Sequence, residues 1–246
     1  GLDSLMKYEK VAVIFIGTDK YLNFLPEWYN RCEEKFLPTV QKQYFVFSDG
    51  KIEGMPTNIS AYSEEHRPWP FITLLRFSSM LKAEEELKDY DWIIFLDADA
   101  FVVDTIQAEE LFTHKPFIGV HHPCHYLKMT PHDEFPGAFE TDEKSHAAIK
   151  ETDDTSVYFQ GCLWGGRVPE VLDMMKELDR RTQDDLRNDV IAKWHDESQM
   201  NKFFAERRSK VHVLHPAYAF PEDFSSHCQF EPKIVHLSKD NSQYHK

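Results

Sequence analysis

The sequence predicts an α/β fold in which a mostly parallel, twisted sheet is flanked by helices within one domain, residues 1–246. Short β-branched or aromatic runs alternate with segments of helical apolar spacing over the first hundred residues. That alternation is typical of doubly wound sheets with right-handed crossovers. The chain has 246 residues, of which 41% are hydrophobic, enough to bury one full core. No internal repeat, low-complexity tract or linker divides it.

The expected elements of the first half follow in order. Residues 11–16 form a β-branched apolar strand, and residues 22–36 carry apolar side chains at helical spacing. A second strand, 44–47, is closed by a Ser-Asp-Gly turn, and 59–62 is a short third strand. Residues 71–87 are expected to form a helix that leads into the next strand.

The second half begins with two apolar strands, 92–96 and 117–120. Residues 121–156 are polar and lack periodicity, which indicates a binding loop, a lid or disorder. The remaining expected elements are a strand at 157–163, a helix at 169–186 with Pro169 in its first turn, a helix at 196–207 and a strand at 211–214.

Acidic side chains follow the strand at 92–96. Five apolar residues precede Asp97 and Asp99, and charges that close to a core are costly unless a cation offsets them. Two residues apart on a continuing strand, both carboxylates share a face and can reach one ion. The pair also fits two solvated acids at a strand end. Because ligands of open α/β sheets bind beyond the carboxyl ends of strands, its position favours a metal ion that holds a phosphorylated ligand.

Composition narrows the classes of function. The formal charge of −14 at pH 7 argues against a nucleic-acid partner, which needs a basic face. No apolar run is long enough to span a membrane, and no signal-peptide pattern opens the chain. Cys32, Cys124, Cys162 and Cys228 are widely spaced, so reduced thiols are expected.

Two further segments carry residues suited to chemistry. Trp194 to Ser198 joins an aromatic, an imidazole and two carboxylates at the start of a predicted helix. The acids there fit helix capping, and equally fit a site where Trp194 meets a sugar ring and a carboxylate meets positive charge. Tyr158 to Gly166 combines aromatics with glycines. This pattern indicates either close approach by a ligand or another backbone, or a core strand that ends in a turn.

Histidines and a basic tail complete the candidates. His121 and His122 are adjacent, so they would point to opposite faces of a strand, and Pro123 constrains the chain; a zinc site is therefore not expected. The C-terminal stretch is basic and either stays solvated or folds over a diphosphate. Its basic residues are Lys233, His236, Lys239, His245 and Lys246.

Together these motifs make the chain resemble glycosyltransferase family 6, which contains the histo-blood-group A and B enzymes and α1,3-galactosyltransferase. The resemblance runs from about Val11 to the C-terminus, and its combined order and spacing are more specific than any single motif. Its anchors are the pair Asp97 and Asp99, the His122-Pro123 step, the segments 158–166 and 194–198, and Asn201-Lys202.

The resemblance implies a GT-A fold, a Rossmann-like sheet with residues 11–99 as the UDP-binding half. Residues 100–246 would form the acceptor-binding and catalytic half with the basic tail. It implies a retaining α1,3-glycosyltransferase that moves galactose or N-acetylgalactosamine from UDP-galactose or UDP-N-acetylgalactosamine to a β-galactoside-type oligosaccharide acceptor. Because Asp97 and Asp99 match the manganese ligands of the family, it also implies dependence on Mn²⁺.

Donor-binding positions are implied residue by residue. Arg76 matches an arginine that reaches the donor, and Asp196 matches a residue that contacts donor sugar hydroxyls. Lys239 and His245 match tail positions where relatives clamp the diphosphate with Lys and Arg; His245 is a weaker, pH-dependent cation. The matches to the uracil and ribose cradle are Ile16, Gly17, Thr18 and Tyr21.

Glu197 matches the carboxylate that faces the anomeric carbon on the side opposite UDP. It would act either as a nucleophile or as a stabiliser of an oxocarbenium-like state, and the sequence leaves both open. His122, Trp194 and His195 match positions near the acceptor and donor sugars, and are expected to bind the acceptor.

Gln160, Gly161 and Cys162 occupy the segment that selects the donor sugar in the family. Relatives carry Gly or Ala where Cys162 stands, so the bulk of Cys162 and Gln160 favours galactose. The amide of Gln160 could equally hydrogen-bond an acetamido group, so both sugars remain open.

Two other classes of protein share part of this pattern. A phosphatase of the haloacid-dehalogenase type also has a D-x-D motif after an apolar strand. In that class, however, Thr or Val occupies the position of Phe101, and the motif usually follows the first strand of the chain, whereas here about ninety residues precede it. A non-catalytic sugar-nucleotide-binding module fits less well beside an intact Glu197 and metal pair. With no membrane anchor and with Met6 close to the first strand, a cytoplasmic enzyme of the short bacterial or viral type is expected.

Overall fold

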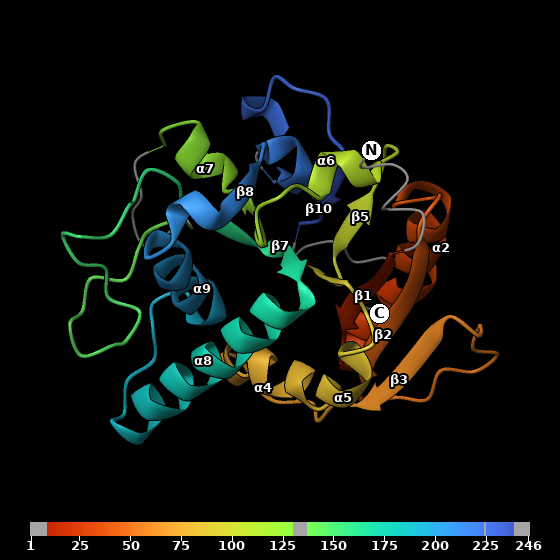
Figure 1. The fold of residues 1–246 in the computed structure, drawn as a ribbon, viewed down its shortest axis with the longest axis horizontal. Helices are drawn as coiled ribbons and strands as arrows, with labels where there is room; N and C mark the ends of the chain where they lie inside the picture. Colours follow the sequence, from red (N-terminus) through yellow and green to blue (C-terminus); the bar gives the residue numbers. More distant parts are fainter. Residues whose placement is uncertain (1–8, 130–136, 224, 239–246) are drawn as a thin grey trace.

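The structure, a computed structural model, describes residues 9–129, 137–223 and 225–238, and Figure 1 shows their arrangement. A seven-stranded sheet in the order β3-β2-β1-β4-β7-β6-β8 forms the centre. Its strands are β1 (Lys10–Ile16), β2 (Gln41–Ser48), β3 (Ile59–Ser63), β4 (Trp92–Leu96), β6 (Phe117–His121), β7 (Phe159–Arg167) and β8 (Val211–Leu214). The pairs β1–β2, β1–β4, β2–β3 and β6–β8 are parallel, whereas β7 runs antiparallel to β4 and β6. The predicted mostly parallel sheet is thereby confirmed.

Helices cover both faces of this sheet. The α-helices are α2 (Leu25–Lys35), α3 (Phe71–Leu74), α4 (Arg76–Leu81), α5 (Glu84–Leu87), α6 (Ala108–Leu111), α7 (Pro123–Tyr126), α8 (Val168–Arg187) and α9 (His195–Ala205). The short 3₁₀ helices are η1 (Asp19–Phe24), η2 (Arg208–Lys210), η3 (Pro216–Ala219) and η4 (Ser225–His227). In Figure 1, α8 runs beside α4 and α5, while α2 lies apart from them.

Side chains of β1 contribute to a hydrophobic cluster on each face of the sheet. Val11 packs in one cluster with Trp28 of α2, and Ala12 packs in the other with Phe77 of α4. All four residues named are at most 1% exposed. Because successive side chains of a strand point to opposite faces, an unbroken apolar run is what a strand buried on both faces requires.

Two predicted helices differ from the observed ones. The helix expected at 22–36 begins as the 3₁₀ turn η1 and becomes α-helical at Leu25. The helix expected at 71–87 is three short pieces, because Leu75 (ψ 16°) and Ala83 (ψ 12°) leave the α-helical region. Apolar periodicity survives such breaks, so periodicity alone did not reveal them.

Glycines explain why β7 extends further than the predicted strand 157–163. A Cβ on Gly165 would lie 2.1 Å from the carbonyl oxygen of Ile93, and one on Gly166 (φ 148°) would lie 2.0 Å from that of Pro116. Neighbouring backbone therefore approaches β7 closely on both sides. Of the two interpretations of these glycines, approach by another backbone is the one the structure shows.

A second, three-stranded sheet was not predicted. Its strands are β5 (Ala100–Val102), β9 (Phe220–Pro221) and β10 (Ile234–His236), in the order β5-β10-β9. β5 starts directly after Asp99 and pairs antiparallel with β10, so Ala100 lies opposite His236. This sheet brings the C-terminal strand to the end of β4.

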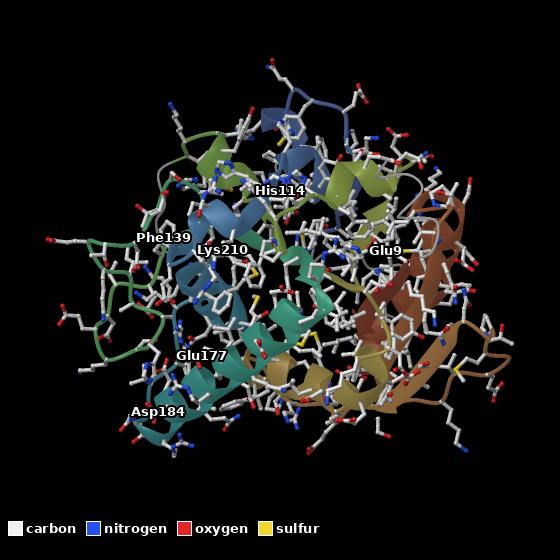
Figure 2. The ribbon with its side chains drawn as sticks, viewed as in Figure 1. Glu9, His114, Phe139, Glu177, Asp184 and Lys210 are labelled. Atoms are coloured by element: carbon white, nitrogen blue, oxygen red, sulfur yellow. The ribbon has the colours of Figure 1, made fainter. Side chains whose placement is uncertain are left out.

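The segment 121–156 was expected to be a binding loop, a lid or disordered. Hydrogen bonds and an ion pair attach much of its described part to α8 and α9. Buried Asp185 accepts hydrogen bonds from Ser145 Oγ (2.6 Å), the His146 amide (2.9 Å) and Gln199 Nε2 (3.0 Å). His146 also contacts Asp184, which Figure 2 labels near the C-terminal end of α8. Within residues 137–156 the chain therefore has few regular elements but many fixed polar contacts.

A buried ion pair completes this attachment. Lys202 Nζ lies 2.6 Å from Asp153 Oδ2, and the two side chains are 7% and 5% exposed. We expect Lys202→Met to lower the free energy of unfolding by roughly 3–5 kcal/mol and the Tm by about 10 °C, because it strands the Asp153 charge in the core. Thermal unfolding followed by circular dichroism measures this shift.

The control is Lys176→Met, which removes an exposed ion pair on α8, with Lys176 Nζ 3.1 Å from Glu84. Exposed pairs contribute at most about 1 kcal/mol, so its Tm should change little. Adding Asp153→Asn to Lys202→Met removes the stranded charge and should recover part of the loss. Equal Tm shifts for the two lysine variants would contradict this account.

None of the helices formed by the described residues has the length and apolar character that crossing a bilayer requires. All four cysteines are buried and free, in agreement with the expectation of reduced thiols.

Candidate active site

One cleft collects most of the residues singled out from the sequence. Its volume is about 480 Å³, and it lies where β1, β4, β7, α3, α9 and β10 converge. A more open hollow of about 560 Å³ is lined by α2 alone, so it brings no distant segments together. The cleft is lined by Ile16, Gly17, Thr18, Tyr21, Trp69, Ile72, Thr73, Arg76, Asp97, Asp99, Gln160, Gly161, Trp194, His195, Asp196, Glu197, Asp223 and His236.

Backbone contacts fix the acidic pair at the end of β4. The Asp97 amide donates to the Cys162 carbonyl of β7 (2.9 Å), and Trp28 Nε1 donates to the Asp97 carbonyl (3.1 Å). The side chains of Asp97 and Asp99 are each 16% exposed. Both carboxylates thus stand at the floor of the cleft, as the strand-end position predicted.

Arg76 lies between two acidic groups. Its Nη2 is 3.4 Å from Asp97 Oδ1 and its Nη1 is 3.4 Å from Asp196 Oδ2. Burial raises the pKa of Asp196 to about 6, although Arg76 opposes that rise. Arg76 also lies over the ring of Phe95, 5.3 Å from its centroid, which fixes the guanidinium between β4 and α9.

His236 joins the acidic pair from the small sheet. Its Nε2 is 3.2 Å from Asp99 Oδ1 and 3.9 Å from Asp97 Oδ2. Burial raises the pKa of Asp99, but the larger effect of His236 together with that of Arg76 outweighs burial, so the pKa lies below its usual value. The sequence presented His236 only as one basic residue of a tail; no local motif links it to residues more than a hundred positions earlier.

These three residues fit a divalent cation. One donor atom from each of Asp97, Asp99 and His236 lies within 4.8 Å of the others. Ligands about 2.0–2.6 Å from one ion are separated by at most about 5 Å, so this spacing suits a shared ion. Carboxylate oxygens with one imidazole suit Mn²⁺ and its neighbours among the first-row metals.

Glu197 lines the cleft, and two groups hold its carboxylate. Its Oε2 accepts a hydrogen bond from the Gly161 amide (3.0 Å), and the buried Tyr158 hydroxyl also interacts with the carboxylate. Burial raises its pKa to about 7, against the opposing effects of Tyr158 and the Gly161 amide. A Cβ on Gly161 would lie 3.3 Å from Glu197 Oε2, so a small residue at 161 keeps this approach open.

Asn201 sets the position of α9 against β7. Its Oδ1 accepts from the Phe159 amide (2.7 Å), and its Nδ2 donates to the Phe159 carbonyl (2.9 Å) and the Glu197 carbonyl (2.9 Å). β7 is irregular just beyond this clamp, since Val120 pairs with Gln160 but Gly119 pairs with Trp164. The residues between them bulge from β6, and the Gly161 amide thereby reaches Glu197.

The start of α9 has features of both interpretations of 194–198, because backbone amides at Asp196 and Glu197 stabilise the Asp196 carboxylate while both acids also line the cleft. No side chain caps the helix at Trp194. Asp196 contacts Arg76 and Glu197 contacts Gly161. The imidazole of His195 lies 3.0 Å from Thr73 Oγ1.

Trp69 is a cleft residue that sequence reasoning missed. It is 69% exposed, and its ring lies edge-on to that of His195, with centroids 4.8 Å apart. A single tryptophan between two prolines is part of no periodic pattern in the sequence. Only its exposure in the folded structure marks it as a candidate binding residue.

Two of the predicted site residues that the structure describes are not part of the cleft lining. Cys162 is completely buried and packs in the hydrophobic core with Leu96 and Leu163. His122 is 2% exposed, and its Nδ1 accepts from the Cys124 amide (3.1 Å) as an N-cap of α7. Lys239 and His245 lie outside the described residues.

Comparison with known proteins places this site in context. The family model for glycosyltransferase family 6 matches residues 5–245. The O-antigen biosynthesis glycosyltransferase WbnI of Escherichia coli is 27% identical over 237 residues, which cover 96% of this chain and 97% of that protein.

Two mammalian proteins are similar over a shorter part of their length. Human globoside alpha-1,3-N-acetylgalactosaminyltransferase 1 is 23% identical over 221 residues, and rat histo-blood group ABO system transferase 1 is 25% identical over 221 residues. In both cases the match covers 86% of this chain and 61% of the mammalian protein. A family match over nearly the whole chain, on a fold that ends its fourth strand in D-x-D, leads to one conclusion: this protein is a glycosyltransferase and belongs to glycosyltransferase family 6.

Proposed function

We propose that this protein is a retaining α1,3-glycosyltransferase. It would transfer galactose or N-acetylgalactosamine from a UDP-sugar to a β-galactoside-type oligosaccharide acceptor, with Mn²⁺ bound by Asp97 and Asp99. The observation that carries the proposal is the cleft in which this pair meets the carboxylate of Glu197. Names of relatives that specify α1,3 transfer of N-acetylgalactosamine support the linkage.

The donor would lie along the end of the sheet. The backbone of Ile16, Gly17 and Thr18, with Tyr21 beyond, lines the part of the cleft nearest β1 and suits a uracil and ribose. Arg76 would bind the donor between the diphosphate and the sugar, and Asp196 would accept hydrogen bonds from sugar hydroxyls. A divalent cation bound there would neutralise negative charge on the departing diphosphate.

Glu197 would stabilise positive charge at the anomeric carbon. In the overall reaction the bond from the anomeric carbon to the β-phosphate oxygen breaks, and a bond to the acceptor oxygen forms. The hydroxyl proton leaves with the diphosphate or solvent. The bond from the Gly161 amide to Oε2 holds the carboxylate in place beside the cleft.

Sugar recognition would fall to the cleft wall formed by α9 and α3. Trp194 and His195 line it, and the exposed indole of Trp69 adds an apolar face on which a ring can stack. Gln160 and Gly161 line the donor side of the cleft, so selection between the two sugars would rest on them rather than on buried Cys162. His122 would act behind this wall, where its ring lies 5.7 Å from that of Tyr158.

The test is UDP release from UDP-galactose and from UDP-N-acetylgalactosamine, with lactose and fucosylated lactose as acceptors, each with Mn²⁺ and with EDTA. Metal-dependent release from one donor, with an α1,3-linked product by NMR, is expected. UDP binding without release would support a non-catalytic binding module and overturn the proposal. Release of phosphate from simple phosphoesters instead would favour the phosphatase alternative, against which the family assignment argues.

The pH dependence follows from the raised pKa of Glu197, about 7 in the free protein. Only the ionised carboxylate can stabilise positive charge, so kcat/KM should fall as the pH drops through this pKa. A bound cation favours the ionised form, so the break in the profile should lie at or below pH 7. Initial rates from pH 5 to 8.5 at saturating Mn²⁺ measure it; a kcat/KM that rises steadily toward pH 5 would contradict the assigned role.

A further inference from the structure

His236 is held rigidly beside the D-x-D pair by its own backbone. β10 pairs with β5, and the Leu237 amide donates to the Asp99 carbonyl (2.9 Å). On its other side, the His236 carbonyl accepts from the Glu222 amide (3.0 Å). The imidazole thus belongs to a hydrogen-bonded strand, which is the kind of support that a ligand needs.

The donor atoms are arranged for one shared ion. Nε2 of His236 faces both carboxylates, at 3.2 Å from Asp99 Oδ1 and 3.9 Å from Asp97 Oδ2. The side chain is 25% exposed, so the space between the three groups is open to the cleft. Asp97 already has Arg76 as a cationic neighbour, but Asp99 has His236 alone among the ion pairs formed by residues 9–129, 137–223 and 225–238.

We propose that His236 is the third protein ligand of the metal ion, which deepens the proposed function and rests on it. The ion would then be held by one nitrogen and two carboxylates, supplied by two different sheets. An imidazole ligand favours Mn²⁺, Co²⁺ and Zn²⁺ over Mg²⁺ and Ca²⁺, which prefer all-oxygen sites. Metal binding would also tie β10, and with it the start of the C-terminal tail, to the end of β4.

The rival interpretation is a plain ion pair between His236 and Asp99 with the metal held by the carboxylates alone. Both interpretations give the same geometry without a metal, and they differ once Mn²⁺ is bound. A ligand imidazole places a nitrogen nucleus in direct contact with the electron spin of the ion, whereas an ion pair does not.

The experiment is pulsed EPR of Mn²⁺ bound to the full chain, without nucleotide, in natural-abundance protein and in protein labelled with ¹⁵N-histidine. We expect nitrogen modulation that changes with the label, its loss in His236→Gln, and a Mn²⁺ Kd raised about 10- to 100-fold in that variant. The control is His146→Gln, an exposed histidine that pairs with Asp184 at the far end of α8; it should leave the signal and the Kd unchanged.

A second variant keeps the proposal testable if His236→Gln folds poorly. His236→Glu supplies a carboxylate of similar reach, so it should bind Mn²⁺ without nitrogen modulation and narrow the preference for Mn²⁺ over Mg²⁺. Nitrogen modulation retained in both variants, or absent from wild type with Mn²⁺ bound, would overturn the proposal. If the wild-type signal lacks nitrogen while UDP release still requires Mn²⁺, this inference fails and the proposed function stands.

Discussion

Replacing Glu197 by Gln is expected to lower kcat about 1,000-fold, or ~4 kcal/mol in the activation barrier, because under the proposed function it removes the negative charge that stabilises the reacting carbon. The substitution keeps the size of the side chain, and its amide oxygen can still accept from the Gly161 amide. The KM for the donor should change little, since the charge matters most in the transition state. Initial rates of UDP release measure both parameters.

Glu197→Gln should also raise thermal stability at pH 8. A carboxyl whose pKa is raised to about 7 by folding destabilises the folded state when ionised, and that cost is fully present above pH 7. A higher Tm together with lost turnover is the pattern expected of a residue kept for chemistry. The matched control is Glu206→Gln at the other end of α9, where the carboxylate pairs with Arg181 on the surface; it should keep full activity. Near-normal kcat in Glu197→Gln would remove Glu197 from the mechanism.

Asp97→Asn is expected to reduce metal-dependent UDP release at least about 100-fold and to weaken Mn²⁺ binding, because a neutral amide is a poor substitute for a ligand carboxylate. The backbone bond to Cys162 and the packing of β4 do not depend on the side-chain charge, so the fold should persist. Titration of Mn²⁺ against UDP release gives both effects.

Asp104→Asn is the control for Asp97→Asn. Asp104 follows β5, its side chain is 61% exposed, and it pairs with Lys233 outside the cleft. It should leave metal dependence unaltered. An Asp97→Asn variant that retains full activity in EDTA would show that the pair does not bind the metal.

Strands of the large sheet could be predicted where apolar runs were long. β1, β2 and β4 are buried on both faces, and such strands are visible as continuous apolar sequence. β5, β9 and β10 have three residues or fewer and exist through pairing between distant segments, which leaves no local pattern. The carboxylates at strand and helix ends were therefore predicted, while the contribution of His236 was not.

The contacts that hold Glu197 in place could not be predicted either, because they also join distant segments. Its place near the start of a helix could be read from the chain, but its bond to Gly161 depends on the β7 bulge and on the clamp by Asn201. For the irregular segment 121–156 the sequence pattern was visible, but its structural meaning depended on the fold. Its polarity indicated a loop, yet Asp185 and Lys202 bury and pair much of that polarity, because α8 and α9 supply partners that only the fold brings near.

Two consecutive residues of β7 form hydrogen bonds with the two acidic residues Glu197 and Asp97 of the cleft. The Gly161 amide bonds to Glu197, and the Cys162 carbonyl bonds to the amide of Asp97. The peptide unit that joins Gly161 to Cys162 therefore sets the distance between Glu197 and Asp97. Under the proposed function, a substitution at Gln160 would change the donor preference without changing this distance, whereas an insertion or deletion at 161–162 would change it. Engineering of donor range in this enzyme should keep the length of β7 constant and vary only the side chains that flank it.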